Sequence, residues 1–156
     1  MQTLTPKFEE VQLIYRNRTK ADERPNVHGS KAAYKILRDS WDMAQINLLE
    51  ESKILLLDRR SRLMSVAHIS TGGMAGTVID PKIVFAIALK RVAHSIIIAH
   101  NHPSGNLKPS TQDIRLTKHL ALVGMMLQLP LEDHLIITQD NYCSLNDEGY
   151  MDYDLD

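Results

Sequence analysis

The stretch SIIIAHNHPSGNLKPSTQD, residues 95–113, decides the fold of this chain. Its first five residues are mostly apolar and predict a strand that is buried on both faces. Residues 100–109 contain two prolines and a glycine and predict a loop. Ser110 then predicts the start of a helix, because its hydroxyl can cap free backbone N–H groups. A strand, a loop and a helix in this order favour a mixed sheet covered by helices.

Strand and helix signals continue on both sides of this stretch. The other predicted strands, all apolar runs next to turn residues, are 53–58, 63–70, 135–137 and 142–145. The other predicted helices run from Ser30 as cap to about Asp42, and from Pro81 with Asp80 as cap. The alternation is irregular and includes a hairpin, so we expect one α/β (α+β) domain with a mixed sheet.

The two ends of the chain are predicted to be less regular than its centre. We expect a strand over 11–15, a polar loop over 17–28, and a connector or short strand over 46–51. The acidic segment from Asp147 is expected to be frayed. The predicted organisation is an N-terminal extension (1–28), one domain (29–150) and an acidic tail (151–156).

Composition favours a single globular domain and excludes several other classes of protein. Hydrophobic residues are 44% and charged residues 24% of 156, which predicts one packed core. A net charge of −1 gives no overall electrostatic basis for DNA binding, and we interpret the local basic clusters as solvated surface. The single cysteine, Cys143, excludes an intrachain disulfide and a zinc site made of cysteines. We find no signal peptide and no membrane span, and expect a cytoplasmic protein.

Two histidines and an aspartate have the spacing of a metal site. His100 and His102 stand two residues apart at a strand end, so both imidazoles lie on one face. Asp113 falls in the first turn of the next helix, which the intervening loop folds back towards the strand. Two imidazoles and a carboxylate leave a fourth position for water, as catalytic zinc sites do. We therefore predict one Zn²⁺ per chain, with a nearby glutamate as general base.

The pattern H-x-H-P-x6-S-x2-D, from His100 to Asp113, resembles the JAMM (MPN+) metalloprotease signature. The wider chain is similar to the bacterial RadC-like JAB proteins. The stretches that carry this similarity are LLLDRRSRL (55–63), STGG (70–73), IIIAHNHPSGNLKPSTQD (96–113) and DHLIIT (133–138). The resemblance covers roughly residues 30 to 150 and implies a fold of the JAMM and cytidine-deaminase type.

The resemblance also implies roles for particular residues. The implied zinc ligands are His100, His102 and Asp113, and Ser110 would help to hold the tetrahedral intermediate. In RadC-like chains the catalytic glutamate lies eight residues before the aspartate that ends the first long strand, which here selects Glu50. Glu51 is adjacent, and because successive strand side chains point to opposite faces, only one of the two can reach the water.

This chain departs from the RadC-like pattern at two points. RadC-like proteins often carry an N-terminal segment that resembles a helix-hairpin-helix DNA-binding module, and we expect this chain to lack it, because few residues precede the matching stretch. They usually carry an aromatic residue two positions after the glutamate, where this chain has Ser52. The strand near Glu50 could therefore pack differently here.

The candidate residues also have purely structural interpretations. Ser110 and Asp113 fit a capping box, although the backbone of Ser110 could cap while its hydroxyl faces the site. His134 is a candidate group behind the metal ligands, or a histidine bonded to backbone at a strand start. The consecutive letters HNH do not indicate an HNH nuclease, because those enzymes disperse the three residues over a ββα unit, and Asn101 should point away from the metal. The H-x-E and P-C-x-x-C patterns of cytidine deaminases are absent.

The predicted function is zinc-dependent hydrolysis of a peptide or isopeptide bond in a protein or peptide substrate. The alternative is a DNA-repair-associated or mobile-element-associated binding protein in which the metal is structural or absent. Glu50 distinguishes the two, because a binding module needs no base beside an open metal position. Pairing of strand edges between copies would make a homo-oligomer.

Overall fold

The apolar strand β3 (Ser95–Asn101) lies at the centre of a five-stranded sheet with the order β2-β1-β3-β4-β5. The computed structural model describes residues 16, 18–73 and 77–152. The other strands in that part of the chain are β1 (Glu51–Leu57), β2 (Leu63–Thr71), β4 (Leu131–Ile137) and β5 (Tyr142–Ser144). Its helices are α1 (Ser30–Ser40), α2 (Pro81–Lys90) and α3 (Thr111–Met126), and a 3₁₀ turn, η1, spans Ala21–Glu23.

Strand β3 has one antiparallel and one parallel neighbour. It pairs antiparallel with β1, where His100 lies opposite Ser52, and parallel with β4, where His100 lies opposite Ile136. A tight turn cannot join parallel strands, so the chain leaves β3, crosses over through α3 and returns as β4. The crossover places the start of α3 near the end of β3, where the predicted ligands lie.

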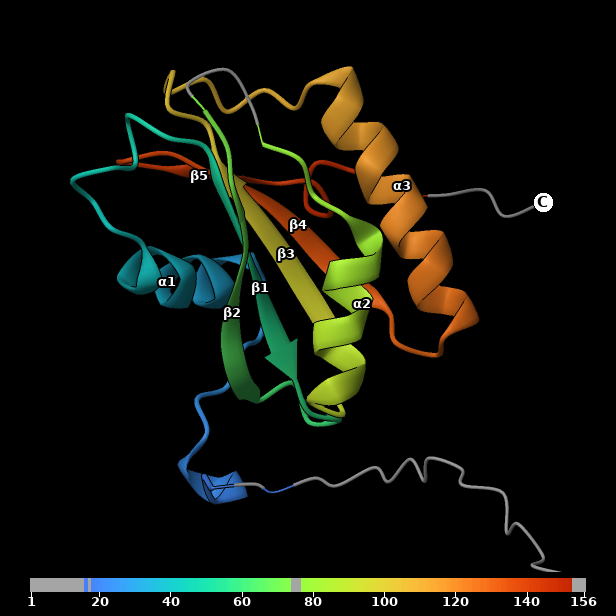
Figure 1. Cartoon of the computed structure of the whole chain (residues 1–156). Helices are drawn as coiled ribbons and strands as arrows, with labels where there is room; N and C mark the ends of the chain where they lie inside the picture. Colours follow the sequence, from blue (N-terminus) through green and yellow to red (C-terminus); the bar gives the residue numbers. More distant parts are fainter. Residues whose placement is uncertain (1–15, 17, 74–76, 153–156) are drawn as a thin grey trace, which may run out of the picture.

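Helices cover both faces of the sheet. Alternation along β1 and β3 directs Leu55 and Ile97 into a core shared with α1, and Ile54 and Ile98 into a core shared with α2 and α3. Figure 1 shows α1 on one side of the sheet and α2 and α3 on the other. The predicted mixed sheet flanked by helices is confirmed, as is the strand buried on both faces.

Helix α2 begins as the sequence predicts. The Asp80 carboxylate accepts a hydrogen bond from the Lys82 N–H at 2.8 Å, and Pro81 occupies the first helical position. Since the first backbone N–H groups of a helix lack partners within it, this cap and the proline fix where the helix starts.

The start of helix α1 differs from the prediction. Its N-cap is Gly29, whose φ of 79° favours glycine, and Ser30 is the first helical residue. The Ser30 hydroxyl instead lies 3.2 Å from the Tyr142 hydroxyl and donates to the Asp147 carboxylate. The predicted cap thus ties α1 to the C-terminal part of the chain. The helix ends at Ser40, two residues before the predicted end.

Three other predictions concern the connector over 46–51, the acidic segment from Asp147 and the strand over 11–15. The connector over 46–51 contains turns, and β1 begins at Glu51 rather than at residue 53. The acidic segment from Asp147 does not fray at once, because Glu148 N–H bonds to Ser144 O and Tyr150 N–H to Leu145 O. The strand predicted over 11–15 lies outside the described residues.

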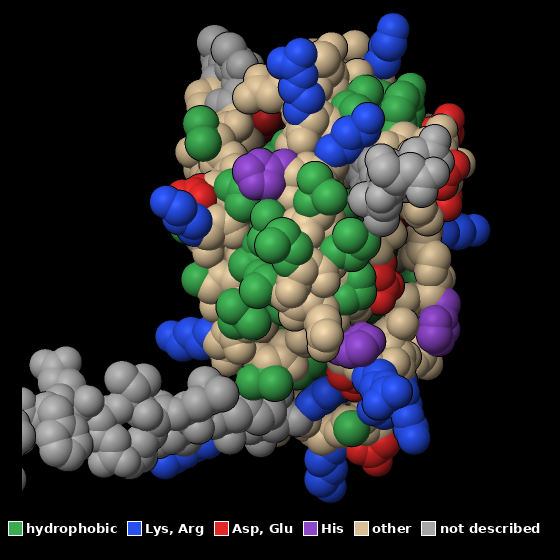
Figure 2. All heavy atoms as spheres, turned by 90° about the vertical axis from the view of Figure 1, so that its right-hand side faces the viewer, with side chains coloured by type: hydrophobic (Ala, Val, Ile, Leu, Met, Phe, Trp, Pro, Cys, Tyr) green, Lys and Arg blue, Asp and Glu red, His purple; other side chains and the backbone are tan. Residues whose placement is uncertain are grey.

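The outer surface of α2 and α3 carries a group of exposed apolar side chains. Figure 2 shows apolar side chains gathered on this side of the molecule. The exposed members on the two helices are Ile83, Leu89, Leu122, Met125 and Met126. Among the described helices, none is both long and apolar enough to cross a bilayer.

Candidate metal centre

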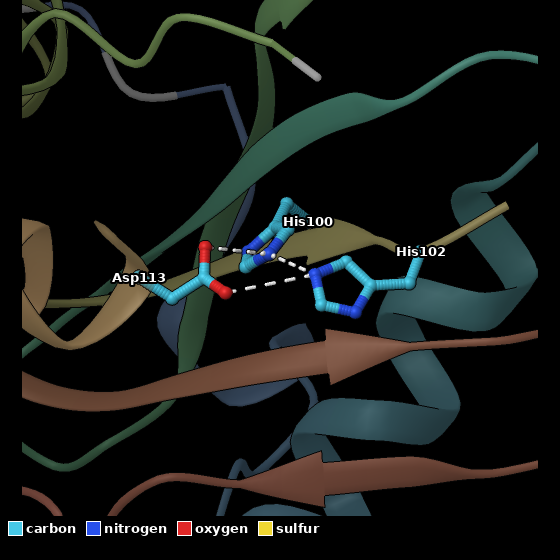
Figure 3. A group of neighbouring side chains, drawn as sticks. All are labelled: His100, His102 and Asp113. Atoms are coloured by element: carbon cyan, nitrogen blue, oxygen red, sulfur yellow. Dashed lines mark hydrogen bonds and ion pairs between the residues drawn. The ribbon is translucent and has the colours of Figure 1, made fainter. Parts of the chain in front are cut away.

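Two imidazoles and one carboxylate converge at the end of β3. The His100 and His102 Nε2 atoms lie 2.9 Å apart, and Asp113 oxygens lie 3.2 Å from His100 Nε2 and 3.7 Å from His102 Nε2. Figure 3 shows the Asp113 carboxylate, from α3, turned toward both imidazoles. Within the described part of the chain, these three residues form the one group of His, Cys, Asp or Glu side chains with a metal-site arrangement.

The second nitrogen of His102 is held by the loop that follows β3. His102 Nδ1 lies 2.6 Å from the Asn106 carbonyl oxygen, which can only accept, so Nδ1 carries the hydrogen. The neutral ring then presents a lone pair at Nε2, toward His100 and Asp113. The His102 backbone N–H donates to Ile137 O at 2.9 Å, which extends the β3–β4 pairing beyond the strand. The ring is therefore fixed from both its backbone and its far nitrogen.

Asp113 serves the helix and the site at once. One carboxylate oxygen, Oδ2, accepts from the Ser110 N–H and hydroxyl, both at 2.7 Å, while Ser110 Oγ accepts from the Asp113 N–H at 3.1 Å. This is a complete capping box, in which both the hydroxyl and the backbone N–H of Ser110 take part. The other oxygen, Oδ1, faces His100.

The cluster shifts the protonation of its members. Burial would raise the pKa of Asp113, but the neighbouring imidazoles of His100 and His102 and the Ser110 hydroxyl hold it far below its ordinary value. The hydrogen bond with Asp113 raises the pKa of His102 above 6.5, although burial opposes this rise. Asp113 is thus ionised at neutral pH and supplies the negative charge of the cluster.

Two buried residues stand behind His100. His134 Nε2 lies 2.8 Å from His100 Nδ1, and His134 Nδ1 lies 2.7 Å from the Thr117 hydroxyl. His134 and Thr117 are both fully buried. The sequence placed His134 among the candidates but missed Thr117. The missed signal is its spacing, four residues after Asp113, which puts both on one side of α3.

A cavity of about 570 Å³ opens beside the cluster. Its lining includes the three candidate ligands together with Glu50, Thr77, Val78, Ile79, Ser110, Gln112 and Leu116. Glu50 therefore borders the same space as the histidines. Glu51 instead accepts a long hydrogen bond, 3.5 Å, from the Thr71 hydroxyl on β2.

Asn101 points to the opposite side of β3 from the two histidines, as its position in the alternation predicts. Its side-chain amide donates to Ile46 O at 2.7 Å and to Leu49 O at 2.8 Å, and its Oδ1 accepts from the Glu51 N–H at 2.7 Å. These bonds hold the backbone on both sides of Glu50 in place. Local sequence patterns do not predict this contact, because it joins residues that are 50 positions apart.

Ser52, at the position where the resemblance implied an aromatic residue, joins a chain of hydroxyl groups. Its Oγ lies 2.7 Å from Ser70 Oγ, which accepts from the Thr77 hydroxyl at 2.8 Å. The Thr77 backbone N–H in turn donates to the Glu50 carboxylate at 3.3 Å. Ser52 is fully buried, and its hydroxyl has a hydrogen-bond partner there.

Three residues of the predicted basic clusters, Arg59, Arg60 and Arg62, lie at the other end of β1 from Glu50. Arg59 and Arg60 are exposed in the turn between β1 and β2. Arg24 and Arg62 each form an ion pair of 3.0 Å with Asp58. The exposure of Arg59 and Arg60 agrees with their interpretation as solvated surface, whereas Arg62 is half-buried in its ion pair.

Comparison with known proteins identifies the family. A model of the RadC-like JAB domain matches residues 27–150. The chain belongs to the RadC-like JAB domain family. The match includes β1, β3, the three candidate ligands and Glu50, so the metal-site geometry lies inside the domain shared with the family.

This RadC-like JAB chain also has many curated bacterial relatives. It is 43% identical to a UPF0758 protein of Flavobacterium johnsoniae over 100 residues, 64% of this chain and 44% of the relative. It is 37% identical to a UPF0758 protein of Porphyromonas gingivalis over 130 residues, 82% of this chain and 56% of the relative. The chain spans about half the length of the curated relatives it matches.

Proposed function

We propose that this RadC-like JAB chain is a zinc-dependent hydrolase that cleaves amide bonds in peptides or proteins. The observation that carries the proposal is the convergence of His100, His102 and Asp113 on one point at the wall of a cavity that Glu50 also lines.

The side chains present fit a zinc ion. Zinc–nitrogen bonds of about 2.0–2.1 Å at tetrahedral angles would put two ligand nitrogens about 3.3 Å apart. His100 Nε2 and His102 Nε2 are 2.9 Å apart, so small side-chain shifts would admit the ion. Two imidazoles and one carboxylate are a usual set for catalytic zinc and leave a position for the reacting groups.

The chain's own residues then divide the chemistry. Bound zinc would polarise the substrate carbonyl and make water easier to deprotonate at neutral pH. The Glu50 carboxylate takes a proton from the water as the water oxygen attacks the carbonyl carbon. As the carbon–nitrogen bond breaks, Glu50 returns that proton to the leaving nitrogen.

Ser110 has a narrower role than the resemblance implied. Its hydroxyl hydrogen points to Asp113 Oδ2 at 2.7 Å, so it orients this ligand directly. To stabilise an oxyanion as well, the hydroxyl would have to turn from Asp113 to the substrate. We therefore propose that the main contribution of Ser110 is to fix Asp113.

The cavities around the cluster favour an extended substrate. A second cavity, of about 280 Å³, shares Glu50, His102 and Ser110 with the first and adds polar residues of the 103–108 loop. The first cavity contributes apolar surface from Val78, Ile79 and Leu116. A polypeptide that crosses the cluster would meet apolar groups on one side of the scissile bond and polar groups on the other.

Zinc content of purified protein tests the metal. Wild-type protein should hold close to one equivalent after dialysis, and His102→Ala should hold almost none. His119→Ala is the matched control, because His119 is exposed on α3 and is not one of the three clustered side chains, so zinc content should stay unchanged. Zinc-free wild-type protein that does not take up added zinc would refute the proposed centre.

A pair of glutamate variants tests the base. Glu50→Gln should retain zinc and lose hydrolysis of peptides found by an unbiased cleavage profile, by about 100-fold or more. Glu51→Gln is the matched control and should remain close to wild type. Equal activity of Glu50→Gln and wild type would remove Glu50 as base.

A further inference from the structure

We infer that Thr117 and His134 set the tautomer of His100, so that its Nε2 lone pair faces the metal position before any metal binds. Thr117 and His134 are positioning residues in this inference, which rests on the proposed metal function and extends it to residues that do not touch the metal. A line of hydrogen bonds runs from α3 to β3, from the Asp113 carbonyl through Thr117 and His134 to His100.

The direction of the line is fixed at Thr117. Its hydroxyl oxygen lies 2.6 Å from the Asp113 carbonyl oxygen, which can only accept a hydrogen bond. The one hydroxyl hydrogen of Thr117 is therefore used there. Toward His134 Nδ1, 2.7 Å away, the hydroxyl can only accept, so Nδ1 must carry a hydrogen.

His134 passes this direction on to His100. Its ring has no exposed surface, and its two nitrogens contact the Thr117 hydroxyl and the His100 ring, so a charged form would be buried without a carboxylate bonded to it. A neutral imidazole carries one hydrogen, which here is on Nδ1, so His134 Nε2 is an acceptor. His100 Nδ1, at 2.8 Å, must then donate to it.

His100 is consequently left with a bare Nε2. That atom faces His102 Nε2, whose own hydrogen is on Nδ1 because of the Asn106 carbonyl, and it faces the Asp113 carboxylate. Three acceptors thus point at one another with no donor among them when both rings are neutral. A cation satisfies all three, and His100 needs no tautomer change to bind it.

The opposite direction is the one serious alternative. If His134 Nε2 donated to His100, the Thr117 hydrogen would have to turn to His134 Nδ1. Two oxygens, of Thr117 and the Asp113 carbonyl, would then stand 2.6 Å apart with no hydrogen between them, which is repulsive. In that alternative His100 would carry its hydrogen on Nε2, directed at the Asp113 carboxylate.

Nitrogen NMR of metal-free protein separates the two directions without any variant. Protein labelled with ¹⁵N histidine would be measured at about pH 8, where ordinary imidazoles are neutral. We expect His100 and His134 both to show a protonated Nδ1 and a bare Nε2. A protonated Nε2 on either ring would overturn the inference.

A pair of Thr117 variants tests the consequence for metal binding. Thr117→Val removes the hydroxyl and keeps the shape, and should weaken zinc binding by about 10–100-fold, the range for groups that orient metal ligands. It should also shift His100 toward the Nε2-protonated form in metal-free protein. Thr117→Ser keeps the hydroxyl and should restore both properties. Wild-type zinc affinity and an unchanged His100 tautomer in Thr117→Val would overturn the inference.

The two proposals fail in different ways. The NMR measurement needs no zinc, so the expected tautomers in a protein that binds no zinc would refute the metal function while supporting the assignment for His100. Zinc binding to wild-type protein with a protonated His100 Nε2 in the metal-free state would do the reverse.

Discussion

The side chains on the two faces of the tripeptide His100–Asn101–His102 find their hydrogen-bond partners in different ways. On one face, every hydrogen-bonding atom of the Asn101 amide meets a backbone group of the 46–51 segment. On the other, two imidazole nitrogens and a carboxylate face one another at 2.9–3.7 Å. The first face is complete with protein groups alone, whereas the second is best satisfied by a cation. The same three residues therefore anchor the segment that carries Glu50 and form the candidate metal site.

The largest expected effect on stability comes from removing the Asn101 amide. Asn101→Ala would leave three backbone groups without partners, at about 1–3 kcal/mol each, so we expect a loss of at least about 3 kcal/mol in unfolding free energy. Urea unfolding of metal-free protein measures it. Asn26→Ala, at an exposed asparagine, is the control and should change stability little. Equal stabilities of the two variants would show that the amide does not hold the 46–51 segment.

The next effect comes from removing a ligand on the other face. Zinc at about 100 times its dissociation constant should stabilise wild-type protein by about 2.7 kcal/mol, because it binds the folded state. His102→Ala should lose this stabilisation while its metal-free stability changes much less than that of Asn101→Ala. Thermal unfolding with zinc and with a chelator gives both values. Zinc stabilisation that survives in His102→Ala would separate the stabilising ion from this cluster.

A smaller effect is expected at the helix start that carries Asp113. Ser110→Ala removes a capping hydroxyl and should reduce unfolding free energy by about 1 kcal/mol. It should also weaken zinc binding, because Asp113 Oδ2 loses one of its two hydrogen bonds from Ser110. Ser110→Thr keeps the hydroxyl and is the control for both measurements. A stability loss without any change in zinc affinity would show that Ser110 caps the helix and does not orient Asp113 for zinc.

The mildest test uses pH. In metal-free protein the pKa of His102 is raised above 6.5 by Asp113, so its protonation stabilises the fold at lower pH. That contribution is lost as pH rises through the folded-state pKa. Zinc needs the neutral ring, so zinc stabilisation should increase over the same interval. Unfolding between about pH 6 and 9 with and without zinc should show these opposite trends, and His102→Ala should flatten both.

The parts of the site that could be predicted depend on local sequence. The alternation at 100–102 separates Asn101 from the histidines, and the spacing of Ser110 and Asp113 marks a helix start. Both patterns follow from the geometry of one element. The family resemblance, confirmed by the match over residues 27–150, supplied the choice of Glu50, whose catalytic role stays a prediction.

The parts that could not be predicted depend on partners distant in the sequence. Ser30 looked like a helix cap, but its hydroxyl bonds to Asp147, 117 residues away. The same is true of the Asn101 contacts and of the Ser52–Ser70–Thr77 chain. A side chain with several available partners takes the one that the tertiary structure brings near, and spacing alone does not reveal it.

The short loop between β3 and α3 also has a consequence for the order of folding. The three candidate ligands lie within one stretch of 14 residues, so closing a single short loop brings them together. Glu50 reaches the same cavity only after β1 has paired with β3, a contact between segments about 50 residues apart. Short-range contacts generally form faster than long-range ones. The metal-binding half of the centre can therefore assemble early on the folding pathway, and the arrival of Glu50 would complete it.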